Sequence, residues 1–240
     1  MRAYHYSFPI HRARRHILIA FAVIIVPIAL LVWFSLISGI NFQSLASDIA
    51  LSMSRLFVAF IIAAALAWLL AVFLTHGKAG ELSLPIFDVL QSMPSFAVLP
   101  LAIIYFGKSD VTIVTFLVLA IIWPILFATV SSIKLADKDW QAVVSMSRIR
   151  GFAYVRYYLV PLSLPGFVTG SIIGLGEGWE ALIATEIIVQ AQRGLGSFFS
   201  GVATDPMLTA FGVLIFLTII FAINKLIWLP LLDWSHRLAA

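Results

Sequence analysis

The feature that most constrains this chain is a series of apolar stretches, each long enough to cross a lipid bilayer. The first, residues 17–37, contains no charge, and about 20 helical residues at about 1.5 Å each span a hydrocarbon core. Five more follow, with few charges inside them: 56–74, 86–106, 111–130, 159–190 and 207–232. Because lipid offers no hydrogen-bond partners, spanning segments of this length form helices. The sequence therefore predicts an all-α polytopic membrane protein with about six transmembrane helices.

The composition excludes several kinds of chemistry. Hydrophobic residues make up 62% of the 240 residues and charged residues only 11%, whereas soluble domains carry about 25% charged residues. The absence of cysteine excludes disulfides and thiolate metal sites. The sequence has no P-loop, GxGxxG, HExxH or GxSxG motif, and its five histidines lie in expected tails and turns: His5, His11, His16, His76 and His236. We expect no enzyme activity, metal site or cofactor in this chain.

The basic residues predict how the chain is oriented. With six spans, twelve of the fifteen Lys and Arg residues fall on the side of the N-terminus, and the other side holds Arg55, Lys108 and Arg193. Basic residues concentrate in cytoplasmic loops, so both termini are expected in the cytoplasm. Orientation then explains the net charge of +4 without nucleic-acid binding. Arg55 is expected at the outer edge of the second span, where its long side chain can snorkel.

The first apolar stretch predicts a retained anchor rather than a signal peptide. It is longer than the apolar part of a signal peptide, and no small-x-small cleavage site follows it. We divide the chain into two parts. Residues 1–50 hold a basic cytoplasmic segment, the first transmembrane helix and an outer loop, and residues 51–240 form the core, with a polar loop at 136–157.

This polar loop, between the fourth and fifth spans, predicts a short amphipathic helix. An aspartate can cap its first turn, an apolar stripe follows beside a polar one, and a glycine suits its end. The residues concerned are Asp137, Asp139, Trp140, Val143, Val144, Arg148, Arg150 and Gly151. Such a helix can lie on lipid, pack on its own bundle or fill a groove on a partner, and periodicity does not choose among these.

The fifth span carries two further patterns. Its glycines repeat every four residues, which predicts a face for close helix packing within the subunit or across a dimer: Gly166, Gly170, Gly174 and Gly178. It also holds Glu177, Glu180 and Glu186. Carboxylates at membrane depth usually face a bundle interior or a water-filled path, and Glu177 and Glu180 share a helix face. The alternative is that the helix ends near Glu177 and all three lie among lipid headgroups.

Three stretches of the chain resemble the transmembrane subunit of type I ABC importers, of the nitrate/sulfonate/taurine/bicarbonate type. They are the segment QSMPSFAVLP at 91–100 with Tyr-Phe-Gly at 105–107, the loop 137–170 with its closing V-P-x-x-L-P and T-G, and the pairs Gly178-Trp179 and Thr185-Glu186 with Gly-Leu-Gly at 194–196. The resemblance covers about residues 51–234.

The resemblance implies a function and a set of partners. The loop 137–151 becomes a coupling helix that docks cytoplasmic ATPases, which bind the ATP and Mg. The other implied partners are a second copy or a related permease, an extracytoplasmic substrate-binding protein and the lipid bilayer of a prokaryotic inner membrane. The implied translocation pathway includes Pro94, Glu177, Trp179, Glu180, Thr185 and Glu186. The implied substrate is a small oxyanion, a sulfonate or a related small organic molecule, whereas Glu177 and Glu180 favour a neutral or cationic one.

The loop departs from the family pattern. Aligned from Pro161 and Pro165, the usual glutamate falls on Ala142 and the usual glycine on Arg148, so the docking contacts do not carry over one by one. Two other functions stay open. A secondary transporter or channel could use the three glutamates as an ion relay, and a membrane scaffold is a third possibility, although a scaffold has no need of carboxylates at depth.

Overall fold

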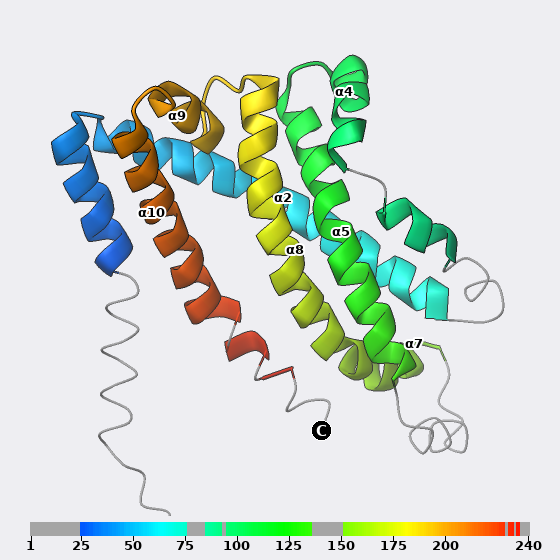
Figure 1. The fold of residues 1–240 in the computed structure, drawn as a ribbon. Helices are drawn as coiled ribbons and strands as arrows, with labels where there is room; N and C mark the ends of the chain where they lie inside the picture. Colours follow the sequence, from blue (N-terminus) through cyan, green and yellow to red (C-terminus); the bar gives the residue numbers. More distant parts are fainter. Residues whose placement is uncertain are drawn as a thin grey trace, which may run out of the picture.

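A computed structural model describes residues 25–75, 85–92, 95–135, 151–228, 230–232 and 234–235. Every regular element within these ranges is helical, as predicted (Figure 1). Their bounds are Ile25–Ser38, α2 Phe42–Thr75, Pro85–Gln91, α4 Ser95–Phe106, α5 Asp110–Lys134, α7 Phe152–Tyr154, the π-helix η1 Val155–Leu159, α8 Val160–Val189, α9 Leu195–Val202, α10 Pro206–Ile223 and the π-helix η2 Asn224–Trp228.

Several of these helices are long and apolar enough to cross a membrane. Four qualify by length and composition: α2, α5, Phe152–Val189 and Pro206–Leu232. Pro85–Gln91 and α4 are apolar enough only when taken together, and the bend of 81° between them fits either a broken fifth span or a re-entrant loop. Ile25–Ser38 is the described part of the first expected span. The protein is therefore an all-α polytopic membrane protein.

Polar side chains define where several helices begin. The Asn41 side chain accepts a hydrogen bond from the Gln43 N–H at 2.8 Å, so α2 begins at Phe42. The Asp205 carboxylate accepts from Met207 and Leu208 N–H groups at 2.9 and 3.1 Å and caps α10. Because α2 begins so early, residues 42–50 are helical, whereas we expected them in an outer loop. The prediction relied on uninterrupted apolar stretches, and it missed this first part of the helix because the segment contains polar residues.

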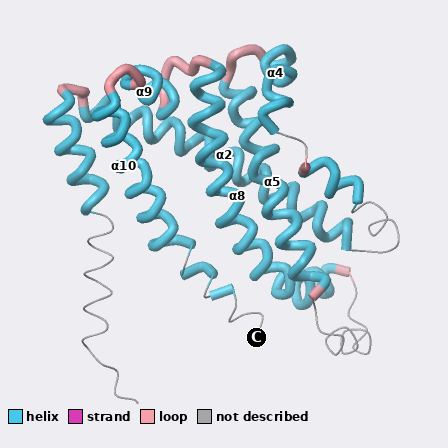
Figure 2. The backbone as a smooth tube through the Cα atoms, in the orientation of Figure 1, coloured by secondary structure: helices cyan, strands magenta, loops and turns pink. Residues whose placement is uncertain are grey.

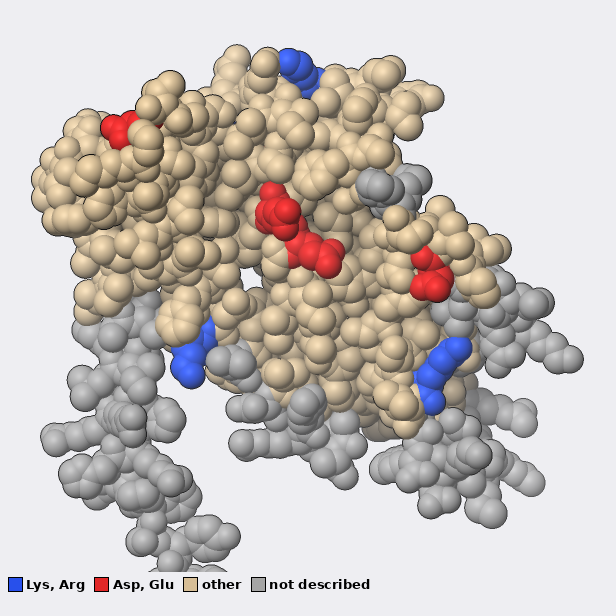
Figure 3. Space-filling model, in the orientation of Figure 1, with Lys and Arg blue, Asp and Glu red and all other residues tan. Residues whose placement is uncertain are grey.

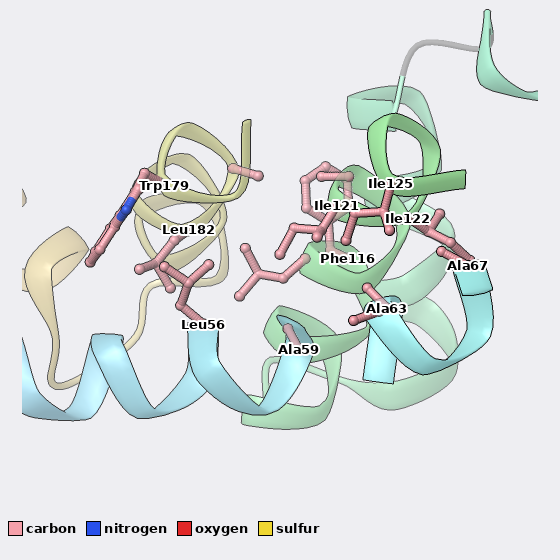
Figure 4. Packing of buried hydrophobic residues seen from close by; sticks show 14 of the residues in the cluster. Leu56, Ala59, Ala63, Ala67, Phe116, Ile121, Ile122, Ile125, Trp179 and Leu182 are labelled. Carbon is pink, nitrogen blue, oxygen red and sulfur yellow. The ribbon is translucent and has the colours of Figure 1, made fainter. Parts of the chain in front are cut away.

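The core is formed where α2, α5 and α8 pack together. Along α2, alanines at every fourth residue are fully buried: Ala59, Ala63, Ala67 and Ala71. Small side chains let two helices approach closely, and Figure 4 shows Ala63 and Ala67 beside Ile122 and Ile125 of α5. The same cluster reaches α8, where Leu182 lies close to Leu56 (Figure 4). These three helices form the central layer of the bundle.

The glycine stripe of α8 lies against α5 of the same chain. A Cβ added at Gly170 would be 2.6 Å from the Pro124 carbonyl oxygen, and one at Gly174 would be 2.8 Å from that of Ile121. Gly166 lies against Ala128 and Ser132 in the same way, and Gly178 against Ile121. The stripe thus brings the backbones of α5 and α8 into contact, and this contact is within the subunit.

The two ends of the bundle differ in their connections. Figure 2 shows short loops at the upper end, which join Ile25–Ser38 to α2, α4 to α5, and α8 to α9. At the lower end α5 stops and α7 begins, and η2 leads to the C-terminal residues (Figure 1). Helices of alternating direction therefore run between two distinct surfaces, as a multi-span membrane protein requires.

Candidate functional site

The three glutamates of the fifth span all lie within one unbroken helix. α8 continues to Val189, where Gln190 in a left-handed conformation closes it. Glu177 lies twelve residues before Val189, a distance of about 18 Å at 1.5 Å per residue. The alternative that the helix ends near Glu177 is therefore wrong, and this carboxylate lies deep along the span.

Glu177 and Glu180 lie on an exposed face of α8. Both side chains are exposed, whereas Glu186 is fully buried. Figure 3 shows acidic side chains together at mid-height, with uncharged residues directly around them and the other charged side chains further out. Neither glutamate has a hydrogen bond or an ion pair with any residue that the structure describes. Since a carboxylate at this depth is costly against lipid, this face needs water or another protein in front of it.

A cavity opens on the same face, between α4, α5 and α8. Its volume is about 470 Å³, within the range of about 300–1,000 Å³ that is usual for small-molecule sites. Its lining combines a carboxylate, an amide and hydroxyl groups with two aromatic rings: Glu177, Gln91, Ser95, Ser131, Trp123 and Phe127. The cavity can therefore offer both polar and aromatic contacts to a small molecule.

Glu186 has a different environment from the other two glutamates. Its carboxylate pairs with the Arg55 guanidinium at 2.6 Å and accepts hydrogen bonds from the Ser52 hydroxyl at 2.7 Å and the Gly196 N–H at 2.8 Å. Its exposed fraction is 0%. In this conformation Glu186 joins α2, α8 and the start of α9, and its predicted place on the pathway stays a prediction.

Arg55 lies inside the protein rather than at its edge. Only 8% of the residue is exposed, and its guanidinium also pairs with Asp110 at 2.6 Å and donates to the Arg193 carbonyl oxygen at 3.0 Å. The expectation that Arg55 snorkels to the interface is therefore wrong. Two carboxylates and a carbonyl oxygen provide the charged and hydrogen-bonding partners of the guanidinium within the protein.

The loop before α9 fits closely around the Glu186 carboxylate. Gly194 has φ of +127°, and a Cβ there would be 2.8 Å from both Glu186 carboxylate oxygens. A side chain at Gly196 would overlap Glu186 itself. The Ser52 hydroxyl completes the enclosure by accepting from the Leu195 N–H at 2.8 Å. We call Ser52, Arg55, Asp110, Glu186, Gly194 and Gly196 the outer cluster.

The sequence analysis did not predict most residues of the outer cluster. Glu186 and the Gly-Leu-Gly segment were noted, but Ser52 and Asp110 were not, and Arg55 was placed at the membrane edge. Arg55 and Glu186 are 131 positions apart, so no periodic pattern connects them. One signal was available, because each is a charge beside a long apolar stretch, and such charges tend to pair.

The remaining predicted pathway residues lie in different places. Trp179 is buried, with its ring 5.2 Å from that of Phe216 on α10 in an edge-to-face contact. Thr185 is fully buried, and its hydroxyl oxygen has no hydrogen-bond partner within the described part of the chain. Pro94 lies outside the described residues, at the break before α4. The pathway role of all three stays a prediction.

The predicted coupling residues lie almost entirely outside the described ranges. Asp137, Asp139, Trp140, Val143, Val144, Arg148 and Arg150 fall within 136–150. Gly151 is described, and its φ of +62° suits glycine at the point where the chain enters α7. Among the described residues, no group of three or more His, Asp or Glu side chains could hold a metal ion.

Comparison with known proteins identifies relatives of this chain. It is 33% identical to the taurine transport system permease protein TauC of Escherichia coli, over 54% of this chain and 48% of the relative. It is 28% identical to the bicarbonate transport system permease protein CmpB of Synechococcus elongatus, over 48% and 41%. It is 29% identical to the nitrate import permease protein NrtB of Leptolyngbya laminosa, over 65% and 56%.

The matched regions are partial, but a family model covers most of the chain. The chain spans about half the length of the curated relatives it matches. The model for the binding-protein-dependent transport system inner membrane component matches residues 63–233, from the middle of α2 to the C-terminal helical segment. The chain belongs to the family of binding-protein-dependent transport system inner membrane components.

Proposed function

We propose that this chain is the transmembrane subunit of an ATP-driven importer and forms the pathway through which a small molecule crosses the membrane. The observation that carries the proposal is the family match over residues 63–233. This region includes α5, α8 and α10, the exposed acidic face of α8 and the polar loop between α5 and α7. Permeases named for bicarbonate, taurine and nitrate among its relatives support the same function.

The proposed docking element for the ATPases is the loop 137–151. It leaves α5 after Lys134 and returns at Gly151, so both of its ends lie at the lower end of the bundle (Figure 1). A closing pair of ATPases would move two such loops together. Because a ligand shifts a conformational equilibrium only through contacts that differ between the states, these loop contacts would drive the change from inward-open to outward-open.

The distribution of basic residues along the sequence supports a cytoplasmic lower end. The three basic residues expected outside are each engaged at the upper end. Arg55 pairs with Asp110 and Glu186. Arg193 lies 3.5 Å from Asp48, and Lys108 donates to the Gln190 side-chain oxygen at 2.6 Å. On the expected topology these are only three of the fifteen Lys and Arg residues, and the positive-inside rule counts basic residues whether or not they are paired.

The exposed face with Glu177 and Glu180 is the proposed wall of the pathway. Lipid is a poor neighbour for two carboxylates, so a second permease copy or a related permease would cover this face and enclose a polar space. An extracytoplasmic binding protein would deliver substrate at the upper end, near residues 190–206. The protein would lie in the inner membrane of a prokaryotic cell with both termini inside, and the partner ATPases would hold the ATP and Mg.

The test is assembly and energy coupling. The chain is expected to co-purify with an ATPase, and the reconstituted complex is expected to hydrolyse ATP faster when a solute-loaded binding protein is present. Arg148→Glu and Arg150→Glu should weaken the assembly. Lys225→Glu, which reverses a charge on η2 at the same expected side, is the control and should leave assembly intact.

The same experiments also distinguish an ATP-driven importer from the alternative, a secondary transporter or channel with an ion relay. An ion relay predicts transport without any ATPase and loss of gradient coupling in Glu177→Gln. The separate environment of Glu186, which is buried against Arg55, speaks against a relay of three glutamates. Full assembly and turnover after both arginine reversals would show that docking occurs elsewhere.

A further inference from the structure

The cavity beside Glu177 has the chemistry of a site for a positively charged group. We infer that this cavity recognises a substrate through a cationic group, such as an ammonium or a quaternary amine, rather than through an oxyanion. The inference rests on the proposed transport function and names the substrate class of that pathway. It differs from what relatives named for nitrate and bicarbonate suggest.

The carboxylate of Glu177 is the first part of this site. It lines the cavity and has no ion-pair or hydrogen-bond partner among the described residues. By contrast, both carboxylates of the outer cluster, those of Asp110 and Glu186, pair with Arg55. An unpaired carboxylate at membrane depth is retained at a cost, and a cationic substrate would offset it. Glu180 lies about one turn further along the same exposed face of α8, outside the wall of the cavity, and adds to the negative potential beside Glu177.

Two aromatic rings supply the second part. Trp123 and Phe127 are four residues apart on α5, so their side chains project from the same side of the helix. Both are partly exposed and line the cavity with Glu177. A cation over an aromatic face is attracted by the electrons of the ring, and tryptophan is the strongest partner. A carboxylate and two rings around one space therefore form a consistent environment for an ammonium group.

The third part is the absence of basic side chains in the described lining. None of the described residues that line the cavity is basic. α5 and α8 present their sides to the cavity, because Trp123 and Glu177 lie well inside them, whereas α4 begins at the lining residue Ser95. An oxyanion would therefore meet a carboxylate without a compensating basic side chain among the described lining residues. The polar groups that remain, Gln91, Ser95 and Ser131, can serve a neutral part of the substrate.

The test uses tetramethylammonium and nitrate as probes on the full chain, purified with the subunits that accompany it. A hydrophobic carbodiimide modifies Glu177, and mass spectrometry measures the rate. Tetramethylammonium is expected to slow this modification at least twofold, and nitrate is expected to leave it unchanged. Trp123→Leu should remove the protection by tetramethylammonium. Protection by nitrate, or no protection by tetramethylammonium, would overturn the inference.

A transport measurement adds a second readout and separates the two proposals. Once a transported solute is known, Glu177→Gln should raise its apparent KM at least tenfold, and Glu177→Asp should raise it less. Glu180→Gln removes the same charge from outside the cavity wall and should have a smaller effect than Glu177→Gln. A chain that assembles with no ATPase would contradict the proposed transport function, while the carbodiimide result would still report on the cavity.

Discussion

Arg55 on α2 and Glu186 on α8 form a buried ion pair, with Nη1 of the arginine 2.6 Å from Oε1 of the glutamate. Glu186 is fully buried and Arg55 is 8% exposed. Asp110, the second partner of Arg55, has a side chain that is 67% exposed, so solvent weakens that contact. The pair with Glu186 is therefore the contact on which the outer cluster depends.

Removal of the Glu186 charge should destabilise the protein strongly. Glu186→Gln leaves the Arg55 guanidinium buried without its main counter-charge, and breaking a buried pair in this way costs about 3–5 kcal/mol. We expect a clearly lower midpoint of thermal unfolding in detergent. Glu180→Gln is the control, because that side chain is exposed and has no described partner. Equal midpoints for the two variants would contradict the structural role of the pair.

The two partners should also be energetically coupled. In Arg55→Met with Glu186→Gln, neither charge is left buried alone, and the amide still accepts from the Gly196 N–H. The double variant should therefore lose less stability than the sum of the single losses, by at least about 1 kcal/mol. A double-mutant cycle of unfolding free energies measures this difference. Strict additivity would mean that the two residues act independently.

Tight packing of α8 on α5 predicts a steric effect at Gly170. A Cβ there would lie 2.6 Å from the Pro124 carbonyl oxygen and 2.7 Å from the Ile125 Cα, both backbone atoms. Gly170→Ala should therefore force the helices apart and cost about 1–3 kcal/mol, seen as a lower unfolding midpoint.

Gly176 provides a matched control on the same helix. Nothing lies within 4 Å of a Cβ added there, so Gly176→Ala should be neutral or stabilise the protein by up to about 1 kcal/mol through helix propensity. A second-copy contact at Gly176 would reverse this result, because alanine would then lower the midpoint or weaken self-association.

The sequence was sufficient for most of the fold because the bilayer leaves few choices. A long apolar run must form a helix, and the expected spans 111–130 and 159–190 correspond to α5 and Phe152–Val189. The glycine stripe likewise predicted close packing. It did not reveal that α5 is the partner, because spacing within one helix carries no information about its neighbour.

The site was less predictable, for a related reason. The helical spacing of Glu177 and Glu180 indicated that they share a face, and α8 exposes both. The separate role of Glu186 depends on Arg55, which lies 131 positions away. The cavity depends on Trp123 and Phe127, which α5 contributes. Both features arise from packing between helices, and the residue pattern within one helix does not predict its contacts with another.

The loop around Glu186 allows one more prediction, at Gly194. Two effects oppose a side chain there: φ of +127° strains any residue other than glycine, and a Cβ would lie 2.8 Å from the Glu186 carboxylate oxygens and the Ser52 hydroxyl. Gly194→Ala should therefore cost at least about 1–3 kcal/mol of unfolding free energy. Gly201→Ala, on α9 with open space around it, is the control.

The two effects at Gly194 can be separated in a second background. Glu186→Ala removes the carboxylate oxygens that the new Cβ would meet, but it leaves the backbone strain unchanged. The cost of Gly194→Ala should therefore be smaller in Glu186→Ala than in the unaltered protein, although still larger than the cost of Gly201→Ala. The same cost in both backgrounds would mean that backbone strain and the Ser52 hydroxyl require the glycine, and that the loop does not depend on the carboxylate for its fit.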